Sequence, residues 1–218
     1  MSVPLDGVRE QTLAEERVNG LTHLVGVGLA VAGLVLLIIG AVDVGPRAVV
    51  ANAIFGTCLI LTYLSSSIYH FLPETHRLKG LFNKFDHASI FLLIAGTYMP
   101  IMLVTVGGGW GWSIFGVQWG IAAIGVVSVI FELDRTRFLK VGAYVGMGWI
   151  LVIVIVPLVE RMSGPGLLWL FLGAASYSVG IPFFLWRSQP YAHAVWHLFV
   201  LGGSISHFFA ALFHLPPV

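Results

Sequence analysis

The chain has 218 residues and a net charge of +1; 58% of its residues are hydrophobic and only 10% are charged, against about 25% charged residues in an ordinary soluble domain. This composition, with a mean hydropathy of +0.94, excludes a soluble enzyme, a disordered chain and a protein with the basic face that nucleic acids require. The one cysteine, Cys58, excludes an internal disulfide framework.

Seven continuous apolar runs are long enough to be transmembrane helices, which need about 20 apolar residues each. The runs do not alternate between polar and apolar residues, which favours helices over the strands of a membrane barrel. In chain order they are Leu21–Val42, Val49–Phe71, Ala88–Val106, Trp110–Phe131, Val141–Val159, Leu167–Trp186 and His193–His214. We therefore expect an all-α fold, with a seven-helix transmembrane domain over residues 21–218.

The first 20 residues form a polar N-terminal tail ahead of the first run. Within it, Thr12 and Glu15 have the spacing of a capping box. This spacing predicts a short interfacial helix before the first span.

Lysine and arginine are distributed unevenly between the two sides of the predicted bundle. The N-terminal tail and the loops after the second (Leu72–Lys84), fourth and sixth runs carry nine of the 11 Lys and Arg residues. The other two, Arg47 and Arg161, fall on the opposite side. Because basic loops stay in the cytoplasm, we expect a cytoplasmic N-terminus, an external C-terminus and a multi-pass protein of the inner (plasma) membrane.

Four polar residues are expected at one membrane depth, near the cytoplasmic ends of their helices. His70 ends the second run, Asp86 precedes the third, and His193 and His197 begin the seventh. The second run descends toward the cytoplasm and the other two leave it, so topology alone brings the four to one level. His193 and His197 are four residues apart and therefore share a helix face.

Three imidazoles with an open fourth position are typical of a catalytic zinc site, so we predict that His70, His193 and His197 bind Zn²⁺. Bound zinc lowers the pKa of its water to about 7, and we expect Asp86 to hold that water as a general base. Ser66, one turn before His70, is expected to hydrogen-bond the water or to orient a substrate carbonyl. Three imidazoles also suit copper, nickel and iron, so the identity of the metal stays open.

Plainer interpretations of these residues also stay open. A histidine pair near an interface can be an amphipathic anchor, and Asp86 can stabilise the N-terminus of the third helix. His207 lies ten residues beyond His197, about 15 Å deeper along a helix, and is expected to make a helix-packing hydrogen bond. His23 begins the first run on the cytoplasmic side, where it is expected behind the metal ligands.

Several motifs, in order along nearly the whole chain, resemble the bacterial haemolysin III proteins, the prokaryotic branch of the progestin and adipoQ receptor family. That family belongs to a wider superfamily of membrane hydrolases that includes the alkaline ceramidases. The superfamily pattern of Ser-xxx-His, Asp and His-xxx-His matches Ser66, His70, Asp86, His193 and His197. The other motifs are Glu15-Glu-Arg-Val-Asn-Gly-Leu-Thr-His23, Ala95-Gly-Thr-Tyr-Met-Pro100 and Gly202-Gly-Ser-Ile-Ser-His-Phe208.

The resemblance implies a seven-helix fold with a cytoplasmic N-terminus, zinc held by the three histidines, Asp86 on the zinc water, and hydrolysis of a lipid amide. Together with the residue pattern it predicts a zinc-dependent membrane hydrolase of a lipid amide or ester, with a membrane lipid as substrate or ligand. The alternative is a non-enzymatic protein with structural zinc that is receptor-like or lyses membranes, the activity that the family's name records. Structural zinc usually has four protein ligands, so three histidines favour the enzyme without deciding the question.

Overall fold

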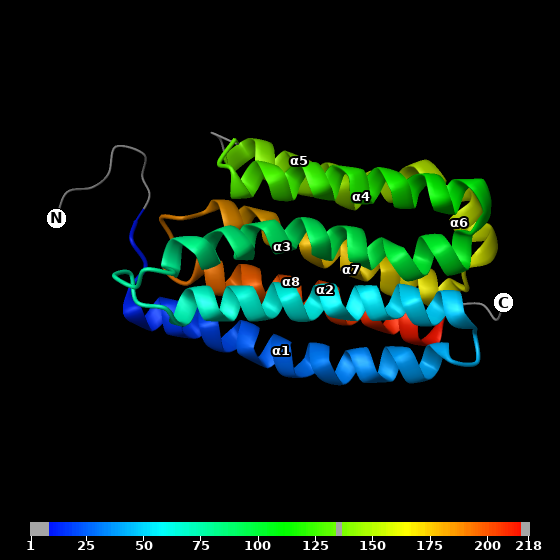
Figure 1. The fold of residues 1–218 in the computed structure, drawn as a ribbon, viewed down its shortest axis with the longest axis horizontal. Coiled ribbons are helices and arrows are strands. Elements are labelled where there is room, and N and C mark those ends of the chain that lie inside the picture. Colours follow the sequence, from blue (N-terminus) through cyan, green and yellow to red (C-terminus); the bar gives the residue numbers. More distant parts are fainter. Residues whose placement is uncertain (1–8, 134–136, 215–218) are drawn as a thin grey trace.

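The computed structural model describes residues 9–133 and 137–214. Within this part of the chain all regular elements are helical, and seven spans are long and apolar enough to cross a membrane. The expected seven-helix bundle is thus confirmed. Figure 1 shows the helices running along one common long axis.

The helices follow one another with short connections. In chain order they are α1 (Leu13–Ala41), α2 (Pro46–Phe71), α3 (Lys79–Pro100), α4 (Gly108–Ile130), α5 (Arg137–Trp149), α6 (Ile155–Arg161), α7 (Gly164–Leu185) and α8 (Ala192–Phe213). A π-helical turn at Ile101–Val106 extends α3, and a 3₁₀ segment at Ile150–Val154 joins α5 to α6 within one span.

The central helix of the bundle is α3. In its span, 78% of an apolar stretch of 18 residues is buried inside the protein, against 22–50% in the other six spans. It packs against α2 and α4 and also contacts α5, while α8 packs against both α7 and α1. The close approach of α2 and α3 depends on Gly96, where a Cβ would lie 2.8 Å from the Cys58 sulfur. The first and last helices, α1 and α8, therefore lie side by side.

Several helices extend beyond the apolar runs at the end of the bundle where α1 begins. Thr12 caps α1 in a capping box with Glu15, as the spacing predicted, but α1 is continuous from Leu13, and the described residues before it, 9–12, form no separate interfacial helix. The loop expected over Leu72–Lys84 is shorter than expected, because α3 already begins at Lys79. Hydropathy marks only the part of a helix that suits lipid, whereas the backbone remains helical into the polar layer.

The fifth span is not the continuous helix expected over Val141–Val159. At the break between α5 and the 3₁₀ segment, the hydroxyl of Tyr98 from α3 accepts a hydrogen bond from the amide of Leu151 at 3.0 Å. The same hydroxyl lies 2.9 Å from the Met147 carbonyl oxygen and 2.8 Å from that of Gly148. A side chain inserted in this way interrupts the run of backbone hydrogen bonds within the helix, and it supplies hydrogen bonds to the backbone groups that lose their partners.

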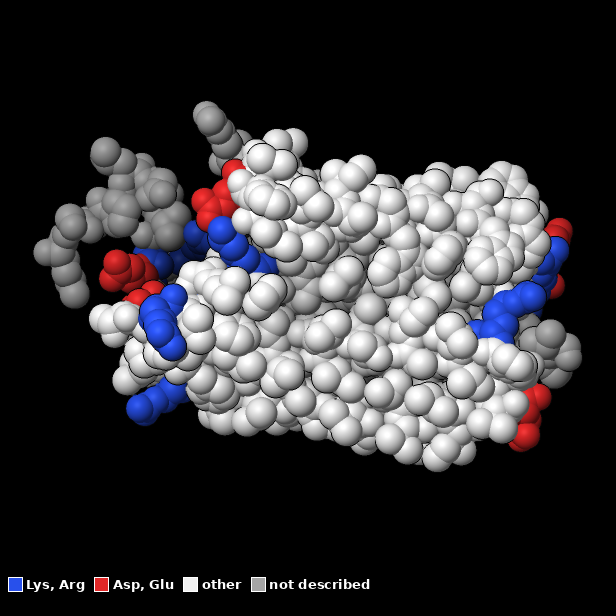
Figure 2. All heavy atoms as spheres, in the orientation of Figure 1, with Lys and Arg blue, Asp and Glu red and all other residues white. Residues whose placement is uncertain are grey.

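Charged side chains gather at the two ends of the bundle, and a broad band without charge separates them on the face shown in Figure 2. This is the surface that a lipid bilayer requires of a protein that crosses it.

Candidate metal centre

Three histidines from two helices meet at the end of the bundle where α1 begins. His70 lies in the last turn of α2, and His193 and His197 lie in the first two turns of α8. One ligand nitrogen from each lies within 4.8 Å of the other two. The ring centroids are 5.1 Å apart for His70 and His193, 5.1 Å for His70 and His197, and 4.5 Å for the pair on α8. The predicted convergence of the three side chains is confirmed.

The ring nitrogens that face away from this cluster are held by α1. Nδ1 of His70 lies 3.1 Å from Oε2 of Glu16. Nδ1 of His197 lies 3.2 Å from the Asn19 carbonyl oxygen and 3.2 Å from the hydroxyl of Thr22, which itself donates to that carbonyl. A hydrogen on each Nδ1 satisfies these contacts, and Nε2 of each ring then keeps its lone pair.

The chemistry of these donors fits a metal ion. His70 is 4% exposed and His197 is 2% exposed, yet Nε2 of His70 has no hydrogen-bond partner in the described part of the chain. A buried nitrogen without a partner is costly, and a metal ion bound by all three imidazoles would satisfy it. A histidine that binds a metal through one nitrogen and a carboxylate or carbonyl through the other is the usual arrangement in metal centres.

Glu16 was not predicted as part of the site. Its carboxylate also accepts a hydrogen bond from Nζ of Lys79 at 3.2 Å, and Lys79 donates to the carbonyls of Tyr69 and Leu72 at 3.0 and 3.1 Å. Four helix ends are thus connected around the histidines. A usable signal was present in the sequence: Glu16, Asn19 and His23 follow at helical spacings of three and four.

His23 lies directly behind a ligand, as expected. Its ring stacks on that of His197, with the centroids 3.5 Å apart and the planes inclined by 13°. Its two nitrogens have no hydrogen-bond partner within the described residues. Nevertheless, His23 is not a member of the three-histidine group.

The other two predicted site residues have different surroundings. Asp86, near the start of α3, is partly exposed and lines both cavities that reach the centre, but it is not in the three-histidine group. Ser66 is fully buried one turn before His70, and its hydroxyl has no hydrogen-bond partner among the described residues. Neither of these two cavities is lined by Ser66.

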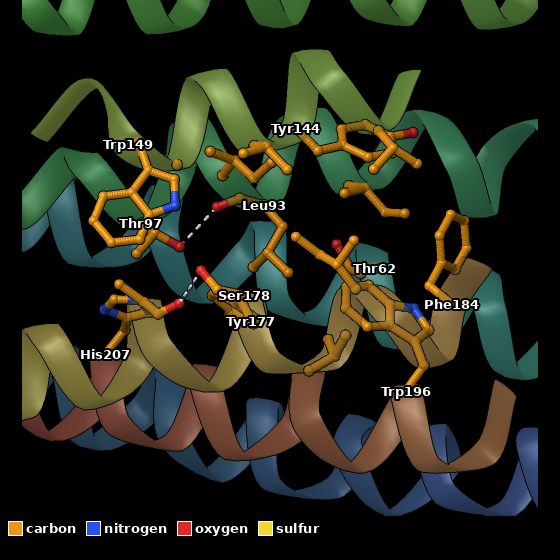
Figure 3. Close-up of a pocket in the computed structure, with 18 of the residues that line it drawn as sticks. Thr62, Leu93, Thr97, Tyr144, Trp149, Tyr177, Ser178, Phe184, Trp196 and His207 are labelled. Atoms are coloured by element: carbon orange, nitrogen blue, oxygen red, sulfur yellow. Dashed lines mark hydrogen bonds between the residues drawn. The ribbon is translucent and has the colours of Figure 1, made fainter. Parts of the chain in front are cut away.

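The two cavities differ in character. A polar vestibule opens at the charged end of the bundle; it is lined by residues that include Arg9, Glu16, Tyr69, Glu74, Asn83 and Arg187. An apolar cavity runs from the histidines into the bundle between α3, α5, α7 and α8 (Figure 3). Asp86, His87, Phe184 and His193 line both. The candidate metal centre therefore lies where a polar entrance meets an apolar interior.

Comparison with known proteins agrees with this architecture. The sequence profile of the family described as Haemolysin-III related matches residues 11–208. Hemolysin-3 of Bacillus cereus is 41% identical over 208 residues, which cover 95% of this chain and 94% of that protein. The Hemolysin-3 homolog of Bacillus subtilis (strain 168) is 42% identical over 205 residues, 93% and 95% of the two chains. The Monocyte to macrophage differentiation factor of Homo sapiens is 26% identical over 214 residues, 95% of this chain and 87% of that protein.

Proposed function

Since the chain belongs to the haemolysin-III-related family of membrane proteins, we propose that it is a zinc-dependent hydrolase of a lipid amide or ester. The observation that carries this proposal is the three-histidine group, with two of its rings held from behind by Glu16 and Asn19. Three protein ligands leave a position for a reacting group, whereas a structural zinc site usually has four protein ligands.

Zinc, when bound by His70, His193 and His197, supplies Lewis-acid activation of water and of a substrate carbonyl. We assign the proton transfers to Asp86, because its carboxylate lines both cavities at the place where they meet. Asp86 takes a proton from the attacking water and returns it to the leaving group. Ser66 lines neither cavity. We therefore assign it an indirect role, in which it helps to orient the attacking water from the side of the centre where His70 lies.

The two cavities suit the two halves of such a substrate. The apolar cavity accommodates an acyl chain, and the polar vestibule admits water and releases the polar product. We place the vestibule in the cytoplasm and the protein in the inner (plasma) membrane, because the N-terminal tail and the basic loops lie at that end. The substrate enters laterally from the cytoplasmic leaflet.

The test is hydrolysis of a ceramide and of an acyl ester by protein purified in detergent, with zinc content measured on the same samples. We expect turnover by the wild type, and a loss of about 100-fold or more in kcat for Asp86→Asn, the usual contribution of a general acid–base group. Zinc content should not change, because Asp86 is outside the histidine group. The matched control is Asp43→Asn, in the exposed turn after α1. A zinc-loaded wild type without activity on either lipid, or a fully active Asp86→Asn, contradicts the proposal.

A second candidate, membrane lysis, is favoured by the names of the two bacterial relatives. It predicts leakage of a dye from liposomes that is dose-dependent and unaffected by His193→Ala. Leakage that requires an intact histidine group and a hydrolysable lipid would instead be a consequence of hydrolysis.

A further inference from the structure

The end of the apolar cavity that lies away from the metal centre carries polar groups. In Figure 3, Phe184 and Trp196 lie toward one end, near the metal ligands, and Thr97, Ser178 and His207 lie toward the other. We call these last three residues the distal polar cluster. They come from α3, α7 and α8, so the bundle brings them together from three separate helices.

His207 is the least satisfied member of this cluster. The residue is 7% exposed, and its Nδ1 has no hydrogen-bond partner within the described residues, which contradicts the helix-packing hydrogen bond expected from the sequence. Its ring packs against Gly173, where an added Cβ would lie 2.6 Å from Nε2. A buried imidazole that lines a cavity without a protein partner is suited to a hydrogen bond with an occupant of the cavity.

The two hydroxyls of the cluster have already donated their hydrogens. Oγ of Ser178 donates to the Ala174 carbonyl and Oγ1 of Thr97 donates to the Leu93 carbonyl, both at 2.8 Å. They can therefore only accept a further hydrogen bond. A neutral imidazole offers one donor and one acceptor. A ligand hydroxyl, which donates once and accepts, fits this combination better than a ketone, which only accepts.

The position of the cluster sets the length of acyl chain that would reach it from the metal centre. His207 lies ten residues beyond His197 on α8, about 15 Å along the helix axis. An extended chain advances about 1.2 Å per bond, taking three bonds per residue of extended backbone. The cluster is therefore about twelve bonds from the metal centre, measured along an extended acyl chain.

We propose that the distal polar cluster is a binding subsite for a hydroxyl group carried in mid-chain by a long acyl group, about twelve bonds from its carbonyl. This inference rests on the proposed function only in placing that carbonyl at the metal centre. The subsite gives the cavity a preference among lipids that an apolar wall alone would not have.

Equilibrium binding to the purified protein tests the subsite without any turnover. Three probes compete with a fluorescent fatty acid: stearic acid, stearic acid hydroxylated about twelve carbons from the carboxyl, and stearic acid hydroxylated next to the carboxyl. We expect the mid-chain hydroxyl to bind about fivefold more tightly than stearic acid, the effect of one hydrogen bond of ordinary net strength. The hydroxyl next to the carboxyl should bring no gain.

Variants at His207 locate the effect. His207→Phe keeps an aromatic ring and removes both nitrogens, so it should abolish the preference for the mid-chain hydroxyl over stearic acid, whereas His207→Gln should retain part of the preference. The matched control is Ser206→Ala, because Ser206 precedes His207, bonds the Gly202 carbonyl at 2.9 Å and lines neither cavity. If His207→Phe does not fold, Ser178→Ala replaces it and should weaken the preference.

Equal binding of the three probes by the wild type, no binding of any probe, or a preference that survives loss of the imidazole overturns the subsite. These outcomes are separate from failure of the proposed hydrolysis. Turnover of a lipid without the preference leaves the hydrolase and removes the subsite. The preference without turnover leaves a lipid-binding subsite and removes the hydrolase.

Discussion

Glu16 contacts one histidine of the candidate metal centre and is itself neutralised by a lysine. Its carboxylate, which is half-buried, lies between the imidazole of His70 and the ammonium of Lys79. A carboxylate on the far nitrogen of a metal-binding histidine fixes the ring and raises its basicity. The three side chains therefore form one unit, in which the lysine compensates the carboxylate and the carboxylate orients the imidazole.

The first prediction concerns this unit. Glu16→Gln keeps the size of the side chain and removes its charge, so it should lower zinc affinity by 10- to 100-fold, the usual range for partners of metal ligands. Lys79 keeps Glu74 and two carbonyls as partners, so the variant should fold. Competition with a chelator of known affinity measures the change.

The matched control for Glu16→Gln is Glu74→Gln. Glu74 also pairs with Lys79, at 3.2 Å, but its side chain is 78% exposed. It should leave zinc affinity unchanged. Equal losses from the two variants would mean that Lys79, and not the contact with His70, governs the site.

The three histidines could be predicted from the sequence, whereas for Glu16 the sequence offered only its helical spacing with Asn19 and His23, which does not say that Glu16 contacts His70. The convergence of His70, His193 and His197 follows from helix direction and the spacing of four, which do not depend on packing details. Glu16 lies outside the apolar run, in residues that hydropathy assigns to a polar tail. Its role depends on how far α1 extends and on how closely its first turns approach α2, which only tertiary packing determines.

At the scale of the helices, the first turns of α1 connect several parts of the bundle. Glu15 completes the capping box with Thr12, pairs with Arg9 and accepts a hydrogen bond at 2.8 Å from the amide of Tyr191, which precedes α8. The start of α1 is thus joined to the start of the helix that carries two of the three clustered histidines. Outside the spans, the hydrogen bond to Glu15 raises the pKa of the Arg9 guanidinium, so the guanidinium stays charged.

The second prediction concerns this helix end. Thr12→Ala removes the side chain that accepts from the Glu15 amide, and should lower the free energy of unfolding by about 1 kcal/mol. Zinc content should not change, because the metal ligands are untouched. Chemical unfolding in detergent measures the free energy.

Thr57→Ala is the matched control, since the exposed hydroxyl of Thr57 bonds only the Ala53 carbonyl within α2. It should change the free energy of unfolding by less than about 0.5 kcal/mol. If Thr57→Ala lowered the free energy of unfolding as much as Thr12→Ala, the cap would contribute no more to stability than an exposed threonine within a helix.

Element boundaries were less predictable than the number of spans. Seven apolar runs were sufficient to predict seven helices. The break in the fifth span could not be predicted, because it is stabilised by Tyr98 from α3, a residue remote in sequence. The early start of α3 was missed because lysine residues were assigned to a loop, whereas Lys79 is buried by its contacts with Glu16 and two carbonyls.

At the scale of the molecule, orientation in the membrane decides which compartment the vestibule faces. The connection between α7 and α8 lies at the end of the bundle where α1 begins, and the turn between α1 and α2 lies at the other end (Figure 1). Most of the basic residues fall on the α1 end, and on this ground we propose that this end lies in the cytoplasm.

The third prediction tests this orientation. Ser188→Cys, in the exposed α7–α8 connection, should react with a membrane-impermeant maleimide only after the cells are permeabilised. Asp43→Cys, in the exposed turn after α1, should react in intact cells. Cys58 is buried and provides an unreactive background. The reverse labelling pattern would place the vestibule outside the cell.

The most direct test of the account is the metal content of the purified protein, measured by mass spectrometry. We predict about one zinc ion per chain in the wild type, the content of a single three-histidine centre. Zinc should be lost from His193→Ala and from His197→Ala but retained in His76→Ala, where an exposed histidine outside the centre is removed. A wild type that holds no metal even after zinc is supplied, or ligand variants that keep it, would contradict the metal centre and with it the proposed hydrolase.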